Sequence, residues 1–485
     1  MKLHLQNVGI IKDSEIELDG LTVITGKNKS GKTTIGRTIY SLFGASHRLE
    51  ESFDESKTRY IRSQMDRVAR ILSLRGFPRY AFQNNATETN KSHVEKVLFD
   101  LENSVYRKLI SEDLYAFLSE AYSSIQDLTF KEYSSFIKNS RVGYPSPLDD
   151  YTEVTNQDFD KKKINALEVF VTTISLLNDK MALYNFWKDR TKAFLNQEFD
   201  GQIKPVKNKR CVSTIELSED SRVIVSIKVK SKENIEILEG DPSKYPFDHC
   251  VFIDDPHIID RLENESRYSI SFLNGLLEDN RKSLISNDYI RTHNDELKSW
   301  LLEKEGKNYF ESIELQIKLK DLFSQINQIV PGEFSRNRDG FFYVEDGAQL
   351  SLKNLATGSK MFFIIKKLLI NGLIDNNTFL VLDEPEAHLH PEWINRFAEI
   401  LVSLIKGVGV NVLLTTHSPN LMLALSVYSR KAQIASKSHF YLAENLTDSY
   451  YSRLKCIDDN IGEGYSHLSI PLVEMNLKLE ELNGD

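Results

Sequence analysis

The stretch LTVITGKNKSGKTTIGRTIYSLF, residues 21–43, sets the architecture of this chain. Its first five residues form an apolar, β-branched run that predicts a buried strand, and TTIGRTIYSLF predicts a helix. Between them, GKNKSGKT fits the pattern GxxxxGK[ST], in which glycines let backbone N–H groups curl around a phosphate at a helix N-terminus. An ordinary strand–helix turn is the alternative, but the flanking elements favour a phosphate loop. The predicted nucleotide-binding residues are Gly26, Lys27, Asn28, Lys29, Ser30, Gly31, Lys32, Thr33 and Thr34.

A second motif, TFLVLDEP at residues 378–385, places two adjacent carboxylates at the end of a continuous apolar run. A phosphate loop needs Mg²⁺ and an oriented water, so Thr33 and Asp383 are the predicted magnesium residues and Glu384 the residue that polarises the water. Lys32 is expected to bridge the β- and γ-phosphates. Taken alone, the pair could be a solvated acidic turn; together with the phosphate loop it predicts ATP hydrolysis.

A histidine ends the next apolar run, VNVLLTTHS, at position 417. A histidine at the end of a strand is most often structural or merely exposed. Here it ends the apolar strand that follows Glu384, 33 residues further on, where a γ-phosphate-sensing histidine would be wanted, and that role is the favoured interpretation for His417.

Composition bounds the protein class. The chain has 485 residues, 41% hydrophobic and 27% charged, which predicts two to four folded units. A net charge of −9 argues against coating nucleic acid by bulk attraction. Cys211, Cys250 and Cys456 lack metal-ligand spacing and are expected to be reduced thiols. The N-terminus predicts a strand pair rather than a signal peptide, and no apolar run could span a membrane, so a cytoplasmic protein is expected.

The order of patterns predicts an α/β fold, a head with a mixed sheet and helices that is split by a largely helical arm or lid. Strands are expected at the start and again around RCVSTIEL, SRVIVSIKVK and HCVFIDD, while the stretches between them show helical spacing. The expected segments are a first head lobe at 1–45, a helical arm at 46–200, head strands at 201–255, a second helical insertion at 256–330 and a second head lobe at 331–485.

The separation of the two motifs points to a family. Lys32 and Asp383 lie about 350 residues apart, whereas AAA+ ring ATPases keep both motifs in one small domain, and a long insertion resembles the SMC-like branch of the ABC superfamily. The loop LATGSK resembles the signature of that branch, although Thr357 and Gly358 depart from its usual form. The signature residues implied are Ala356, Thr357, Gly358, Ser359 and Lys360. The resemblance implies that this loop contacts ATP on a facing subunit, so that two chains sandwich two ATP molecules.

The run EPEAHLHP at residues 384–391 resembles the D-loop of OLD-family-related ATPases and of the anti-phage ATPases of Septu, retron and PARIS systems. NLATGSK and VLLTTHSPNLMLALSVYS resemble the same group, so the similarity covers about residues 1–45 and 350–445. His388 and His390 are the implied D-loop residues; a metal site is the alternative, but it lacks a third nearby ligand.

Two departures limit the resemblance. OLD-family nucleases continue into a Toprim domain, but too few residues follow His417, and Asp458 and Asp459 are adjacent rather than spaced as DxD. We therefore expect that the chain is not itself a nuclease. The glutamine that normally precedes the signature is not identifiable; Asp254 or Asp255, after HCVFI, could replace it, and a solvated strand end is an equal alternative.

The resemblance implies an Mg²⁺-dependent ATPase of anti-phage defence that forms an ATP-dependent dimer, or a larger assembly such as a hexamer. It would control or carry a separate Toprim-like or HNH-like nuclease and respond to a phage protein. A RecF-like DNA clamp and an ATP-gated scaffold with negligible turnover are the alternatives. DNA binding stays open, since basic groups are present but most such runs are solvated: Lys161, Lys162, Lys163, Lys204, Lys207, Lys209, Arg210, Lys228, Lys230 and Lys232.

Overall fold

The computed structural model describes residues 1–74, 92–103, 105–140, 155–262, 292–302, 317–337, 340–446 and 450–483. The chain divides into two compact units, one formed by Met1–His47 with Trp187–Asp485 and the other by Arg48–Phe186. Parts of the predicted helical segments, at 75–91, 141–154, 263–291 and 303–316, lie outside the described residues.

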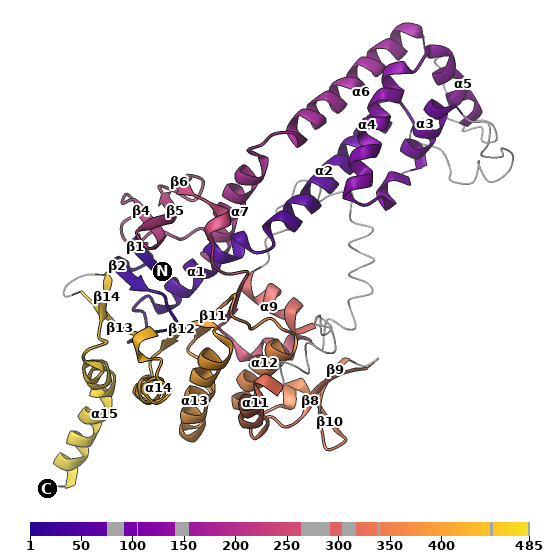
Figure 1. The fold of residues 1–485 in the computed structure, drawn as a ribbon. Coiled ribbons are helices and arrows are strands. Elements are labelled where there is room, and N and C mark those ends of the chain that lie inside the picture. Colours follow the sequence, from indigo (N-terminus) through magenta and orange to yellow (C-terminus); the bar gives the residue numbers. More distant parts are fainter. Residues whose placement is uncertain are drawn as a thin grey trace. The chain divides into compact units, whose positions relative to one another are not determined.

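The first unit is built on a mixed sheet, drawn in Figure 1, whose described strands run in the order β6-β5-β4-β1-β2-β14-β13-β3-β12-β11-β7. One half, with β1, β2, β4, β5 and β6, is antiparallel, and the other half, from β13 to β7, is parallel. The strands are β1 (Lys2–Val8), β2 (Ile11–Glu17), β3 (Leu21–Gly26), β4 (Ser213–Glu219), β5 (Arg222–Val229), β6 (Ile235–Gly240), β7 (His249–Ile253), β11 (Thr378–Asp383), β12 (Asn411–Thr416), β13 (Ser438–Asn445) and β14 (Ser452–Cys456).

The parallel half collects the sequence motifs at one edge. All six residues of β3 are buried, and β11 and β12 are buried almost throughout, as continuous apolar runs require when helices cover both faces. The carboxyl ends of β3, β12, β11 and β7 meet at the same edge because these four strands are parallel and in register. Gly26, Asp254, Asp383 and Thr416 therefore lie at the same edge although they come from distant parts of the sequence.

Helices of the same unit cover the parallel strands and share one apolar core with them (Figure 1). Helix α13 shows why they form: His390 is its N-cap, Pro391 occupies its first turn, and Gly409 ends it in a left-handed conformation with φ 87°. The described helices are α1 (Lys32–Ser46), α9 (His293–Leu302), α11 (Lys320–Asn327), α12 (Thr357–Ile370), α13 (Pro391–Val408), α14 (Pro419–Lys431) and α15 (Ile461–Asn483), with short 3₁₀ turns η3 (Pro242–Lys244), η4 (Pro256–Arg261), η5 (Leu352–Asn354) and η6 (Ala435–Lys437).

A separate small antiparallel sheet lies between α11 and α12 in the sequence. Around FSRNRDGFFYVEDG, β8 (Glu333–Asn337) pairs antiparallel with β9 (Gly340–Glu345), and β10 (Ala348–Ser351) adds a third strand. The predicted loop ahead of α12 begins directly after this sheet.

The second unit is helical in its described part. Its apolar residues form a core of their own, which includes Met65, Leu118 and Phe170. Thr155 and Asp158 form a reciprocal capping box at the start of α6, which fixes where that helix begins. The elements are α2 (Leu49–Ile71), α3 (His93–Asn103), η2 (Val105–Lys108), α4 (Ser111–Asp127), α5 (Phe130–Ser140) and α6 (Asn156–Leu177), and α7 (Ala182–Glu198) begins here and continues into the first unit.

The predicted fold class is confirmed: an α/β unit with a large mixed sheet is interrupted in sequence by a helical insertion. No helix in the described ranges is long and apolar enough to cross a membrane.

Candidate active site

The phosphate loop connects β3 to α1 in a backbone conformation that few residues other than glycine adopt. Gly26 has φ 154°, and a Cβ there would lie 2.8 Å from the carbonyl oxygen of Ala443. Gly31, with φ 92°, precedes α1, and no side chain caps the N-terminus of that helix. The first N–H groups of α1 therefore point out of the helix without a side-chain acceptor, which is the arrangement that binds an anion.

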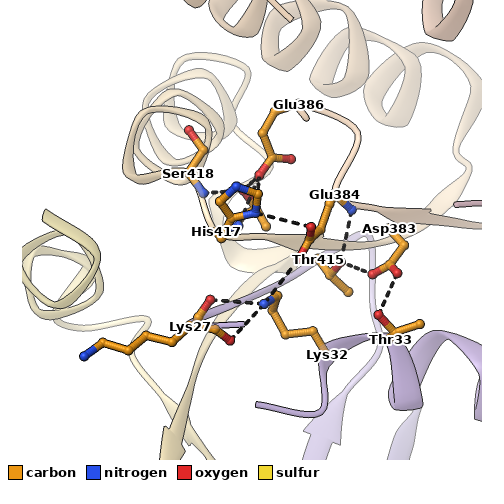
Figure 2. A network of polar contacts seen from close by, with 11 residues as sticks. Lys27, Lys32, Thr33, Asp383, Glu384, Glu386, Thr415, His417 and Ser418 are labelled. Atoms are coloured by element: carbon orange, nitrogen blue, oxygen red, sulfur yellow. Dashed lines mark hydrogen bonds and ion pairs between the residues drawn. The ribbon is translucent and has the colours of Figure 1, made fainter. Parts of the chain in front are cut away.

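Within the loop, Lys32 is the buried cation. Its side chain is 4% exposed, and Nζ donates to the carbonyl oxygens of Gly26 and Lys27, both at 3.1 Å. Lys27, by contrast, is exposed, and Figure 2 shows its side chain directed away from the network. Ser30 adds a buried hydroxyl that has no hydrogen-bond partner among the described residues. A phosphate on the loop would supply the missing acceptor.

The remaining loop residues are not equally placed. Asn28 and Lys29 are exposed, while Thr33 and Thr34 are half-buried in the first turn of α1. The Thr34 side chain lies against Gly9 of the turn between β1 and β2, where a Cβ would be 3.2 Å from Oγ1.

Asp383 connects the phosphate loop to the neighbouring strands, as Figure 2 shows. Thr33 Oγ1 donates to Asp383 Oδ2 at 2.7 Å, and Thr415 Oγ1 donates to Asp383 Oδ1. Burial raises the pKa of Asp383; the two hydroxyl donors lower it, and the negative charges of Glu384 and Asp254 raise it further. Negative charge is thus concentrated at the end of β11, where the carboxylate of Asp383 contacts the hydroxyl of Thr33.

These groups fit magnesium. Mg²⁺ prefers hard oxygen ligands and is commonly held by one or two carboxylates together with substrate phosphates. Asp383 and the hydroxyl of Thr33 are such ligands, and a cation would relieve the crowding of negative charge around Asp383. Over the described residues there is no group of three or more histidine, cysteine or acidic side chains that could hold a metal by itself, so nucleotide phosphates would have to complete this site.

Glu384 occupies the centre of the network. Its backbone has φ 49°, and its N–H donates to the carbonyl oxygen of Thr415 at 3.1 Å and to the hydroxyl of the same residue at 3.2 Å. These bonds hold a strained turn that directs the carboxylate back over the phosphate loop. The carboxylate lies 3.4 Å from Lys32 Nζ and 3.4 Å from His417 Nδ1. Because its side chain is 34% exposed, a water can reach it.

His417 follows β12 and faces Glu384 with a side chain that is 44% exposed. A second carboxylate, that of Glu386, accepts a hydrogen bond from the His417 backbone N–H at 3.1 Å and another from Thr416 Oγ1. Burial raises the pKa of Glu386, and the hydrogen bonds from Thr416 and His417 oppose that rise. Glu386 thus fixes the turn that presents His417 to the site.

Sequence reasoning missed Thr415, Thr416 and Glu386. A weak signal was present, since two threonines precede His417 and a second glutamate follows Glu384 by two positions. What the sequence could not supply is the parallel register of β11 and β12, which pairs Asp383 with Thr415.

Asp254 and Asp255 follow β7 and have different partners. Asp255 caps η4 by accepting from His257 N–H at 2.8 Å, whereas Asp254 lies beside Asp383 and accepts from His293 Nε2 at 2.9 Å. Burial raises the pKa of Asp254, but the hydrogen bond and charge of His293 outweigh burial and leave it lowered. The second oxygen, Oδ1, is buried without a partner in the described parts of the chain. Of the two aspartates, Asp254 is therefore the one with a free acceptor near the site.

His293 carries charge in this environment. Burial lowers its pKa, but hydrogen bonds to Asp254 and Glu198 and the charges of both carboxylates outweigh burial and raise the pKa to about 9.

A folded-state pKa above the ordinary 6.5 means that the bonded imidazolium stabilises the protein fully below pH 6.5 and that this stability is lost as pH rises through 9. Between pH 6.5 and pH 9, we expect the free energy of unfolding of the wild type to fall by about 3 kcal/mol from this source. The free energy of unfolding of His293→Gln should fall much less over the same range. Urea titrations at several pH values between 6 and 9.5 measure the difference. Equal pH slopes in the two proteins would show that His293 is not charged in the fold.

The five predicted signature residues lie in a different cluster. Ala356 is the exposed N-cap of α12 and makes no side-chain hydrogen bond to the helix, and Thr357 and Gly358 are half-buried in the first turn. Ser359 and Lys360 are buried. A Cβ on Gly358 would lie 3.1 Å from the ring of Trp393, so the small residue permits close packing of α12 on α13. The predicted signature residues thus run from the exposed Ala356 to the buried Lys360.

Lys360 is the buried end of an ion pair. Its side chain is 2% exposed, and Nζ lies 2.6 and 2.8 Å from the two carboxylate oxygens of Asp260 on η4. The pair therefore connects the start of α12 to the turn that follows β7.

Removing this lysine should destabilise the first unit. Lys360→Met removes the ammonium from the Asp260 carboxylate, which keeps its contact with His257 Nδ1 at 2.9 Å, and deleting one member of a largely buried pair costs up to about 3 kcal/mol. All three tryptophans, Trp187, Trp300 and Trp393, belong to the first unit, so their fluorescence in urea reports its unfolding. The double variant Lys360→Met/Asp260→Asn should recover most of the loss. An unchanged urea midpoint in Lys360→Met would contradict a stabilising pair.

The predicted D-loop histidines also have local partners. His388 packs its ring edge-on against His257 with centroids 5.4 Å apart, and His390 accepts from Glu392 N–H at 3.4 Å as the N-cap of α13. The His388 carbonyl oxygen would lie 3.2 Å from a Cβ on Gly358, so His388 borders the first turn of α12.

Several of the basic residues noted in the sequence form hydrogen bonds or ion pairs within the chain. Lys230 pairs with Glu236 at 2.6 Å, and Lys204 donates to the Lys230 carbonyl oxygen at 2.6 Å. In the second unit, Lys162 and Lys163 donate to Ser73 and to the Leu128 carbonyl oxygen. Lys207, Lys209 and Arg210 are exposed in the loop before β4, where Lys207 Nζ lies 5.0 Å from the centre of the Tyr450 ring, and Lys161 and Lys232 are exposed elsewhere.

The model of a family described as AAA ATPase domain matches residues 1–422, which is most of the chain. No curated protein matches.

Among solved structures, the chain is similar to an SMC head domain from Thermotoga maritima, at 11% identity and a TM-score of 0.35, covering 94% of this chain and 98% of that one. It is also similar to an Smc head bound to the C-terminal winged-helix domain of ScpA, at 10% identity, a TM-score of 0.37 and coverage of 95% and 98%. A third similarity, to an Smc head with an extended coiled coil bound to the C-terminal domain of ScpA from Pyrococcus furiosus, has 12% identity, a TM-score of 0.36 and coverage of 99% and 98%.

Proposed function

We propose that this chain, which belongs to the AAA ATPase domain family, hydrolyses ATP at the network formed by Lys32, Thr33, Asp383, Glu384 and His417. The observation that carries the proposal is the convergence of phosphate loop and acidic pair: Thr33 donates to Asp383 at 2.7 Å, and Lys32 and His417 each lie 3.4 Å from Glu384. A carboxylate between a buried ammonium and an exposed imidazole can orient a water next to a bound phosphate.

Each residue has a defined task in that reaction. The N–H groups at the start of α1 bind the β-phosphate, and Lys32 neutralises negative charge on the transferred phosphoryl group. Glu384 accepts a hydrogen bond from the attacking water and holds it in line. His417 donates to the γ-phosphate from the other side of Glu384. Bound at Thr33 and Asp383, Mg²⁺ would neutralise charge on the phosphate oxygens.

Asp254 is the residue we propose in place of the glutamine that is missing from the sequence. It lies next to Asp383 at the edge of the sheet, and its buried Oδ1 lacks a partner in the described part of the chain. That oxygen can accept a hydrogen bond from a water at the nucleotide. Asp255 does not have this freedom, because it caps η4.

We further propose that two chains complete two sites. Ala356 is exposed and Thr357 and Gly358 are half-buried at the start of α12, so this turn could face the nucleotide of a second copy. Backbone N–H groups at an uncapped helix start suit a γ-phosphate. The D-loop residues His388 and His390 border this turn through Trp393 and His257 and would belong to the same interface.

The biological role we propose is anti-phage defence, in which ATP-driven assembly controls a separate Toprim-like or HNH-like nuclease and a phage protein is the trigger. Support comes from the EPEAHLHP and NLATGSK motifs. The neighbouring gene would identify the effector.

Four measurements on the purified chain test the proposal. ATP hydrolysis should require Mg²⁺ and stop in EDTA, and light scattering should show an increase in mass with ATP. DNA cleavage by the chain alone would refute a separate effector. Strong ATP-dependent binding to duplex DNA with a steep salt dependence would instead favour a RecF-like clamp.

A further inference from the structure

A buried histidine connects two carboxylates in the first unit. His293, the first residue of α9, has a side chain that is 8% exposed, with Nδ1 2.7 Å from Glu198 Oε2 and Nε2 2.9 Å from Asp254 Oδ2. Its backbone N–H also donates to Glu198 Oε1 at 3.1 Å. The ring stacks on Phe252 of β7 with centroids 4.4 Å apart. An imidazole that bonds a carboxylate through each nitrogen donates from both, so the ring is held in one orientation.

The two carboxylates belong to different parts of the unit. Asp254 follows β7 and lies beside Asp383 in the site. Glu198 is the last residue of α7, and its side chain is 3% exposed. The histidine therefore joins the edge of the nucleotide site to the end of the helix through which the chain re-enters the first unit after residues 48–186.

Helix α7 is also fixed to α1, the helix that starts at the phosphate loop. Arg190 donates to the carbonyl oxygens of Gly44 at 3.2 Å and His47 at 3.0 Å, which are acceptors at the end of α1. Trp187 Nε1 donates to Ser46 Oγ at 3.1 Å. Consequently α7 is connected in two places to elements that form the site: to α1 at its C-terminal end, and to Asp254 through the Glu198–His293–Asp254 bridge.

We propose that His293 is a positioning residue, which holds Asp254 at the nucleotide site and makes the order of the end of α7 depend on whether nucleotide is bound. The inference rests on the proposed function, because it assumes that ATP occupies the site beside Asp254. If nucleotide binding orders Asp254, part of the binding free energy also orders the end of α7 through the bridge. Removing the bridge should then uncouple the order of α7 from nucleotide binding.

Two substitutions separate the two halves of the bridge. In His293→Asn, the amide lies near the position of Nδ1 and can keep the Glu198 contact while losing Asp254. In His293→Gln, the longer amide lies near Nε2 and can keep Asp254 while losing Glu198. We expect the asparagine variant to lower kcat about 10-fold or more, as for residues that orient a catalytic ligand, with a smaller change in the KM for ATP. We expect the glutamine variant to stay within about threefold of wild-type kcat.

Hydrogen exchange on the full chain provides the second readout. In the wild type, a non-hydrolysable ATP analogue with Mg²⁺ should slow amide exchange in residues 187–198. In both variants this nucleotide-dependent protection should be lost. His439→Asn is the matched control, because His439 pairs with Asp458 at 3.0 Å near the start of β13, at the opposite edge of the sheet from the phosphate loop. It should leave both kcat and the α7 response unchanged.

Several results would overturn the proposal. One is wild-type kcat and wild-type protection in both variants. Another is an equal loss of kcat in both variants together with a lower melting temperature, which would show a purely structural role. A wild type that does not hydrolyse ATP would refute the proposed function. Hydrogen exchange in residues 187–198 with the bound analogue would still test whether the bridge couples α7 to the nucleotide. Failure of the analogue to protect residues 187–198 in the wild type would refute the bridge alone.

Discussion

Glu384→Gln should reduce ATP hydrolysis by about 10²–10⁴-fold while leaving ATP binding intact. Glutamine has nearly the same shape as glutamate and can keep its contact with Lys32, which lies 3.4 Å from the carboxylate. It cannot accept a proton from water, so the step that depends on the carboxylate fails. Because bound ATP is then no longer consumed, the two-chain assembly should persist. Phosphate release measures the first effect, and light scattering with ATP measures the second.

Two neighbouring glutamates serve as controls for this substitution. Glu386 bonds Thr416 and the His417 N–H, so Glu386→Gln keeps one acceptor oxygen and should cost far less activity than Glu384→Gln. Glu392, in the exposed first turn of α13, controls for the loss of one negative charge. If Glu384→Gln hydrolyses ATP at the wild-type rate, the catalytic assignment is wrong; if Glu386→Gln alone is inactive, Glu386 rather than Glu384 activates the water.

The local parts of this site could be predicted because each is encoded in a short segment. The loop GKNKSGKT, the strand TFLVLDE and the strand VNVLLTTHS carry their own strand or helix signals, and buried parallel strands read as continuous apolar runs. Once these strands are parallel, their ends must meet at one edge, so the neighbourhood of Lys32, Asp383, Glu384 and His417 follows from the pattern.

Contacts that depend on register or on distant segments could not be predicted. Thr415 donates to Asp383 because β11 and β12 pair in one register, and a shift of two residues would remove that contact. The partners of Asp254 and Lys360 are His293 and Asp260, and no local periodicity relates them. A polar residue in a short motif predicts chemistry, but whether it faces the ligand or pairs internally is decided by packing.

Lys360 and Lys32 illustrate this limit. Both are lysines at the start of a helix that follows a small-residue loop, and both are almost fully buried. Lys32 lies at the phosphate loop and contacts loop carbonyl oxygens and Glu384, whereas Lys360 forms an ion pair with Asp260. The first is available to a phosphate, and the second already has a carboxylate.

Lys32→Ala should abolish measurable ATP hydrolysis. The buried ammonium lies inside the loop, with Nζ 3.1 Å from the Gly26 and Lys27 carbonyl oxygens. Removing a preorganised group that stabilises transition-state charge costs about 10²–10³-fold in kcat, and the lost ground-state contact with the phosphates lowers affinity as well. Phosphate release at saturating ATP and equilibrium binding of a fluorescent ATP analogue separate the two losses.

The exposed lysine of the same loop is the matched control. Lys27→Ala removes the same charge from a side chain that points away from the network, so hydrolysis should change by less than about threefold, because a surface charge is largely screened. Lys32→Arg keeps the charge but places a planar fork where a compact ammonium fits, and it should stay well below wild type. Equal effects of Lys27→Ala and Lys32→Ala would mean that the loop attracts ATP by net charge alone. Activity retained in Lys32→Ala would instead place the phosphate elsewhere and remove the basis of the proposed site.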